Sequence, residues 1–135
     1  MADSTFTFRL VTPQLLLLET PVVSLQAPGS EGYLGILAHH APLITMLRPG
    51  RLDVKEPGGQ AASYAVSGGF LEVSNNRATV LADSAERMDQ IDRGRAEAAL
   101  KRAEDRLKAA GPDIDVMRAQ AALERARNRL AIPKG

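Results

Sequence analysis

The sequence contains neither cysteine nor tryptophan among its 135 residues. Without cysteine there can be no disulfide, no cysteine-ligated metal and no thiol nucleophile, so thiol chemistry is excluded. The longest apolar run, Leu15–Leu18, is far shorter than the roughly 20 residues that span a bilayer. Met1–Ser4 also lacks the basic charge that is typical of a signal peptide. We therefore expect any membrane association to be indirect.

Aromatic residues are few, and all of them lie in the first part of the chain: Phe6, Phe8, Tyr33, Tyr64 and Phe70. Up to Asp83 the chain has five basic and seven acidic residues, whereas from Ser84 onward it has twelve and nine. The second part is rich in alanine, arginine, glutamate and leucine, which favour helices. The composition therefore predicts two domains, a β domain over residues 1–85 and a helical domain over residues 86–135.

The first domain shows short alternating segments, beginning with Phe6, Phe8 and Leu10 on one face of a strand. The further strand candidates are Leu15–Glu19, Val22–Ala27, Leu34–Leu37, Leu43–Leu47, Arg51–Glu56, Ala61–Ser67, Phe70–Ser74 and Ala78–Ala82. The turn candidates between them are Pro13, Pro21, Pro28-Gly29, Pro49-Gly50, Pro57-Gly58-Gly59, Gly68-Gly69 and Asn75-Asn76. Many short strands without intervening helices predict an antiparallel β-sandwich or flattened barrel.

The second domain has apolar residues at helical spacing over residues 91–110 and again over residues 113–131. Gly111-Pro112-Asp113 lies between these segments, and it combines a helix-ending glycine with a proline suited to a helix start. We therefore expect an antiparallel two-helix hairpin, and the whole chain to be of the α+β class. The predicted contact between the two helices is rich in alanine, which buries little apolar area. We therefore expect weak packing and a hairpin that can detach.

No catalytic constellation is visible in the sequence. It has no nucleophile triad, no paired carboxylate site and no Walker-type glycine loop with lysine. The adjacent His39 and His40 would point in opposite directions in a strand, so they would not chelate one metal together. A lone histidine beside a proline, such as His40 before Ala41-Pro42, is more often a hydrogen-bonded loop anchor than a ligand or base. We expect a protein that is not an enzyme, needs no cofactor and has no metal site.

Three parts of the chain are informative when taken together: residues 32–43, residues 67–73 with 79–86, and the predicted helical hairpin. In order and spacing they resemble the epsilon subunits of bacterial F-type ATP synthases. Residues 32–43, GYLGILAHHAPL, are similar to the family signature G-x-x-G-x-L-x-x-H-A-P-L, which places Gly32, Gly35, His40 and Pro42 in a structural or partner-binding motif. Residues 67–73 with 79–86 look like the strand pair that closes the family's β domain. The helical hairpin that ends at residues 128–130 is the third segment. Together the three cover nearly the whole chain.

This resemblance implies a non-catalytic subunit of the central stalk, on the cytoplasmic face of the bacterial inner membrane. The β domain would bind the gamma subunit and the ring of c subunits and couple their rotation to ATP synthesis. The hairpin would regulate: when extended, it would contact the alpha and beta subunits and inhibit ATP hydrolysis. The resemblance implies neither nucleic-acid binding nor direct membrane insertion.

The resemblance also implies a regulatory ATP site, because residues 91–96 match the family motif I/L-D-x-x-R-A. Arginines recur at i, i+7 and i+11 in both predicted helices, which places each set on one helical face where guanidinium groups can bind phosphate. The candidate ATP-binding residues are Glu86, Ile91, Asp92, Arg95, Ala96, Arg102, Arg106, Arg118 and Arg125, with Arg129 completing the second set. The alternative interpretation is a solvated helical surface with ordinary i, i+4 ion pairs such as Glu97 with Lys101.

Two other classes of protein stay open at this stage. The chain could be a free-standing nucleotide-sensing β-sandwich module, which a tight complex with gamma would exclude. A nucleic-acid binder is the second class, but the predicted helices lack aromatic residues to stack on bases, and their part of the chain has a net charge of only +3.

Overall fold

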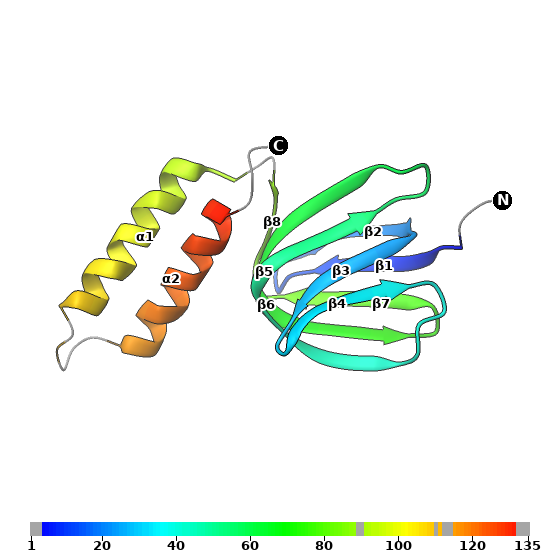
Figure 1. Ribbon diagram of the computed structural model, residues 1–135, viewed down its shortest axis with the longest axis horizontal. Helices are drawn as coiled ribbons and strands as arrows, with labels where there is room; N and C mark the ends of the chain where they lie inside the picture. Colours follow the sequence, from blue (N-terminus) through cyan, green and yellow to red (C-terminus); the bar gives the residue numbers. More distant parts are fainter. Residues whose placement is uncertain (1–3, 89–90, 110, 112–114, 132–135) are drawn as a thin grey trace. The chain divides into compact units, whose positions relative to one another are not determined.

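The computed structural model describes residues 4–88, 91–109, 111 and 115–131. They form two compact units, one ending at Arg87 and the other beginning at Met88 (Figure 1). This division falls two residues after the boundary expected at residues 85/86, because Glu86 and Arg87 lie in a strand. Of the expected turn Gly111-Pro112-Asp113, only Gly111 lies within the described residues.

The first unit is built from one sheet of eight strands. The strands are β1 (Phe6–Val11), β2 (Leu16–Val22), β3 (Ser24–Gly29), β4 (Gly32–Leu37), β5 (Leu43–Lys55), β6 (Ala61–Ser74), β7 (Arg77–Ala82) and β8 (Ala85–Arg87). Their order in the sheet is β2-β1-β7-β6-β5-β3-β4, and β8 pairs with β6.

The two long strands β5 and β6 take part in both layers of the sandwich. The second half of β6, Gly69–Ser74, pairs with β7, whereas Tyr64–Val66 in its first half pairs with β8. The expectation of turns at Pro49-Gly50 and Gly68-Gly69 is wrong, because both dipeptides lie inside continuous strands. Gly68 and Gly69 have φ of 106° and 124°, values that let glycine bend a strand where other residues are strained.

The strand pairings are antiparallel, as expected, with one exception. β1 and β7 run parallel, with Phe8 opposite Ala78 and Leu10 opposite Val80. These strands are about 70 residues apart in the chain, so no local turn signal reports their pairing.

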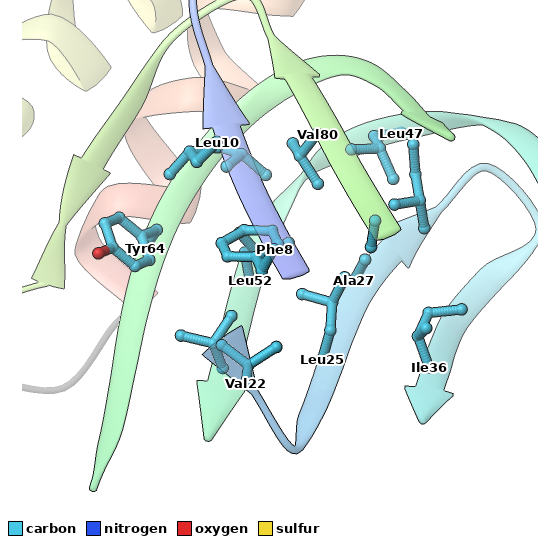
Figure 2. Packing of buried hydrophobic residues seen from close by; sticks show 14 of the residues in the cluster. Phe8, Leu10, Val22, Leu25, Ala27, Ile36, Leu47, Leu52, Tyr64 and Val80 are labelled. Atoms are coloured by element: carbon cyan, nitrogen blue, oxygen red, sulfur yellow. The ribbon is translucent and has the colours of Figure 1, made fainter. Parts of the chain in front are cut away.

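The core lies between the two layers and consists of the inward residues of alternating strands. Figure 2 shows Phe8 and Leu10 of β1 directed toward Leu25, Leu52 and Val80, which come from β3, β5 and β7. All five are at most 1% exposed. At roughly 1.5–3 kcal/mol for each large side chain buried, this cluster is the main source of the sandwich's stability.

The second unit is a pair of packed helices, α1 (Arg93–Lys108) and α2 (Val116–Ala131). Arg93 at the start of α1 bonds to Leu130 near the end of α2, so the helices run antiparallel, as expected. Their buried residues are mostly alanines: Ala96, Ala103, Ala119, Leu123 and Ala126.

Candidate functional site

The motif at residues 91–96 begins α1. Asp92 is the N-cap, and its Oδ1 accepts a hydrogen bond of 3.0 Å from the Arg95 backbone N–H. Ala96 is buried at 1% exposure, Ile91 is half-buried, and the Arg95 side chain is exposed. The aspartate and the alanine of this motif therefore have structural roles, which makes Arg95 the residue of the motif best placed to meet a ligand.

Gly94 is the second residue of α1, in the first turn and not in the helix interior. An added Cβ there would meet only Asp92 Oδ1, at 3.6 Å. Glycine lowers helix stability most in a helix interior, and here the Asp92 cap stabilises the turn in which Gly94 lies.

The start of α2 repeats the start of α1. Asp115 Oδ1 accepts a hydrogen bond of 3.0 Å from the Arg118 backbone N–H. Residues 92–107 and 115–130 are in fact identical at ten of sixteen positions, including Asp92/Asp115, Arg95/Arg118 and the buried Ala96/Ala119. The arginine spacing is apparent from the sequence, whereas Asp115 was not predicted as a cap, and this internal repeat is the signal that identifies it.

The repeat determines where the arginines lie. At about 100° per residue, Arg95, Arg102 and Arg106 lie about 80–120° to one side of the buried Ala96. Arg118, Arg125 and Arg129 have the same relation to Ala119. Two antiparallel helices that pack through equivalent residues are related by a local twofold axis, so both sets of arginines lie on the same face of the hairpin.

This arginine face is largely open to solvent. All of its arginines are exposed except Arg129, which is half-buried. The opposite flank of α1 carries Glu97, Lys101, Glu104 and Lys108, which mix the two signs of charge. The hairpin thus has one uniformly basic face, which is suited to a phosphate or carboxylate ligand.

Glu86 does not belong to the hairpin. It lies in β8, opposite Ala65 of β6. Its expected role at the base or ribose of a nucleotide stays a prediction.

The signature segment 32–43 forms β4 and the connection to β5. Gly32 has φ of 133° at the start of β4, while Gly35 lies mid-strand with nothing within 4 Å of an added Cβ. His40 is exposed, and its Nδ1 lies 2.7 Å from the Ala41 carbonyl oxygen, so the ring is hydrogen-bonded within its own loop. Pro42 comes immediately before β5.

Asn76 connects this loop to two other segments, and the sequence analysis did not single it out. Its Oδ1 accepts from the His39 backbone N–H at 2.8 Å, and its Nδ2 donates to the Thr5 carbonyl at 2.9 Å. His39 and Asn76 both have positive φ, 64° and 57°. This end of the sandwich is therefore held by side-chain bonds as well as by strand pairing.

A row of five apolar side chains, four of them exposed and Val11 half-buried, crosses the outer face of one layer. The cross-strand register places Met46 opposite Phe70, Phe70 opposite Leu81, Leu81 opposite Val11 and Val11 opposite Leu16. We call Met46, Phe70, Leu81, Val11 and Leu16 the outer apolar row. Met46 is 59% exposed and Phe70 48%. Contiguous exposed apolar surface of this kind marks protein interaction sites.

A polar row lies next to the outer apolar row on the same face. It contains Glu72, Thr79, Arg9 and Glu19, in the order set by the strand register. Arg9 Nε lies 3.5 Å from Glu19 Oε1. An apolar strip with charges along one side is the arrangement of an interface core and its rim.

No helix within the described part of the chain is long and apolar enough to cross a membrane. In the same residues, no three His, Cys, Asp or Glu side chains lie together as a set of metal ligands.

Comparison with known families assigns the fold and both of its parts. The family described as ATP synthase, Delta/Epsilon chain, beta-sandwich domain matches residues 5–88. The family described as ATP synthase, Delta/Epsilon chain, long alpha-helix domain matches residues 89–132. The chain belongs to the ATP synthase delta/epsilon chain family.

Relatives and solved structures agree with this assignment. The chain is 52% identical over 107 residues to an ATP synthase epsilon chain of Desulforamulus reducens, covering 79% of this chain and 80% of that one. It is 50% identical over 107 residues to that of Pelotomaculum thermopropionicum, covering 79% of each. A chain of the Euglena gracilis mitochondrial ATP synthase has a TM-score of 0.85 and 25% identity, with 97% of this chain and 82% of that chain covered.

Proposed function

We propose that this chain is the epsilon subunit of a bacterial F-type ATP synthase, a non-catalytic part of the central stalk at the cytoplasmic face of the membrane. The observation that carries the proposal is the outer apolar row on a rigid sandwich, in a family whose members are named as ATP synthase chains. In this role the sandwich binds the gamma subunit and the c-ring, and couples their rotation to ATP synthesis.

The outer apolar row is the surface we assign to gamma. Phe70 and its neighbours Met46 and Leu81 lie on the long strands and on β7, which the core holds from behind. A preformed apolar surface binds without a large cost of ordering its own side chains. The adjacent Arg9 and Glu19 would then orient the partner through charge.

The hairpin supplies regulation. It exchanges between a closed form and an extended form, in which the arginine face contacts acidic surfaces of the alpha and beta subunits and inhibits ATP hydrolysis. The alanine-rich contact between α1 and α2 supports this exchange. It buries little apolar area, so little free energy is lost when the closed form opens. ATP shifts the balance only if it binds one form more tightly than the other.

Reconstitution tests the role of the whole chain. ATP synthase assembled without this subunit should hydrolyse ATP with little ion pumping into vesicles, because its stalk lacks the connection to the ring. Adding the purified chain should restore pumping. The pumped ion is followed in parallel with phosphate release, and full coupling without the chain would contradict the proposal.

ATP binding is tested by calorimetric titration of the chain. We expect saturable binding that Arg102→Ala and Arg125→Ala each weaken about tenfold or more, since a hydrogen bond to a charged group contributes roughly 1.5–3 kcal/mol. Asp92→Asn is preferable to Asp92→Ala, because asparagine keeps the cap on α1 while it removes the charge.

Lys101→Ala is the matched control for this titration. Lys101 is exposed on the flank of α1 away from the arginine face, so its loss removes one positive charge without touching the proposed site. If Lys101→Ala and Arg102→Ala weakened ATP binding equally, the loss would be explained by net charge alone and not by a site on the arginine face. No heat from the parent chain would leave the arginine face as a surface for protein partners alone.

A further inference from the structure

The two ends of the hairpin are held together in different ways. At one end the chain itself connects α1 to α2. At the other end Arg93, the first residue of α1, reaches across to α2, and its Nη2 donates a hydrogen bond of 2.8 Å to the Leu130 carbonyl oxygen. Leu130 is the next-to-last residue of α2.

This bond joins a cationic side chain at the start of α1 to a backbone carbonyl oxygen at the end of α2. The last carbonyls of a helix have no intrahelical partner, and they form the negative end of its dipole. Arg93 lies at the positive end of its own helix, whose first turn has no acidic residue. In the closed hairpin the same guanidinium meets the negative end of α2, a favourable interaction that it lacks when the helices are apart.

The hydrogen bond of Arg93 matters because the remaining contacts between α1 and α2 contribute little free energy. Apart from Leu123, the buried residues of the hairpin are alanines, which release little free energy on burial. The internal repeat also shows that Arg93 is specific to this end. Its counterpart at the start of α2 is Val116, which is 51% exposed and has no side-chain donor.

We propose that Arg93 is a positioning residue that latches the open end of the hairpin. The bond to Leu130 forms when α1 and α2 lie together, and it must break before they separate. The latch itself is a property of the isolated chain. Its consequence for enzyme regulation rests on the proposed function, in which an extended hairpin inhibits hydrolysis.

Spin-label distances in the full-length chain test the latch, and the absence of native cysteine makes labelling specific. One pair of labels at Ala98→Cys and Glu124→Cys reports on the open half of the hairpin, and another at Asp105→Cys and Met117→Cys on the connected half. All four positions are exposed. Arg93→Ala should raise the separated population of the open-end pair roughly tenfold and leave the other pair unchanged.

Two further variants separate the bond from charge and from folding. Arg127→Ala removes an equal charge from the exposed surface near the same end of α2, and it should leave both distance distributions as in the parent. Arg93→Lys keeps a cationic donor and should restore part of the closed population. Its helicity, measured by circular dichroism, should equal that of the parent, which keeps the test valid if Arg93→Ala loses helix.

An unchanged open-end distance in Arg93→Ala would overturn the latch. Equal broadening of both label pairs would also overturn it, because the residue would then support the helices in general. The assembled ATP synthase provides the separate test of regulation, where Arg93→Ala should deepen inhibition of hydrolysis. If Arg93→Ala altered the distance between the open-end labels but not ATP hydrolysis by the assembled enzyme, the latch would be confirmed and the proposed regulatory role of the hairpin would be contradicted.

Discussion

Gly69→Ala should prevent the sandwich from folding stably. A Cβ at this position would overlap the carbonyl oxygen of Leu81 and lie 2.9 Å from Ala82 Cα, both of them backbone atoms of β7. The φ of 124° adds strain for any residue with a side chain. Backbone paired in a sheet cannot move aside, so we expect a loss of about 4 kcal/mol or more, comparable to the whole stability of a small domain.

Thermal unfolding followed by circular dichroism measures this effect, with Gly35→Ala as the matched control. Gly35 also lies inside a strand, but an added Cβ has nothing within 4 Å. It should change stability by less than about 1 kcal/mol. Melting temperatures that are equal for the two variants would show that β6 and β7 can separate, contrary to the close approach seen at Gly69.

The same glycine explains one failure of the sequence analysis. Gly68-Gly69 and Pro49-Gly50 have the composition of turns, and the structure uses both inside long bent strands. Local chemistry reports only that the backbone must adopt an unusual conformation or lack a donor. Whether the chain then reverses or continues depends on its pairing with the neighbouring strands, β6 for Pro49-Gly50 and β5 and β7 for Gly68-Gly69, and the dipeptides themselves carry no signal for that pairing.

The strand positions up to Ala82 were predictable, because alternation is a local signal, whereas the three-residue β8 is too short to show it. The inward set Phe6, Phe8 and Leu10 is buried in the structure, as the pattern indicated. Alternation cannot distinguish a face toward the core from an exposed apolar face, however. Phe70 and Leu71 are equally apolar neighbours, yet Leu71 is fully buried and Phe70 is part of the outer apolar row.

The candidate site on the hairpin was likewise predictable only in part. Periodicity placed the arginines on one face of each helix, and it needed only the helical repeat. That the two faces coincide follows from the antiparallel packing of equivalent alanines. The contact from Arg93 to Leu130 joins residues 37 positions apart, and no spacing rule predicts it.

The distribution of stability in the chain is consistent with the division of roles that we propose. The sandwich buries large side chains such as Phe8, Leu10 and Leu52, whereas the hairpin buries mainly alanine. A rigid unit is suited to transmit torque, and a weakly packed unit can change form at a small free-energy cost. A few bonds at the ends of the helices, such as that of Arg93, can then decide which form is populated.

Phe70→Glu should reduce the affinity for the gamma subunit by about 100-fold or more without unfolding the chain. Phe70 is the aromatic residue of the outer apolar row and lies between Met46 and Leu81, and its side chain is already half in solvent. Central aromatic residues of interfaces commonly contribute 2 kcal/mol or more, and a carboxylate buried against an apolar partner adds a desolvation cost. Titration of labelled chain with purified gamma measures the change.

Leu37→Glu is the control, because it makes the same change of polarity at a more exposed position, 64% against 48%. Leu37 lies at the end of β4, at the other edge of the sheet from the outer apolar row, so its affinity for gamma should equal that of the parent. Equal unfolding temperatures for the parent and both variants would show that the sandwich is intact. Phe70→Glu with parental affinity would mean that gamma binds elsewhere, and the outer apolar row would then need a different partner to cover it.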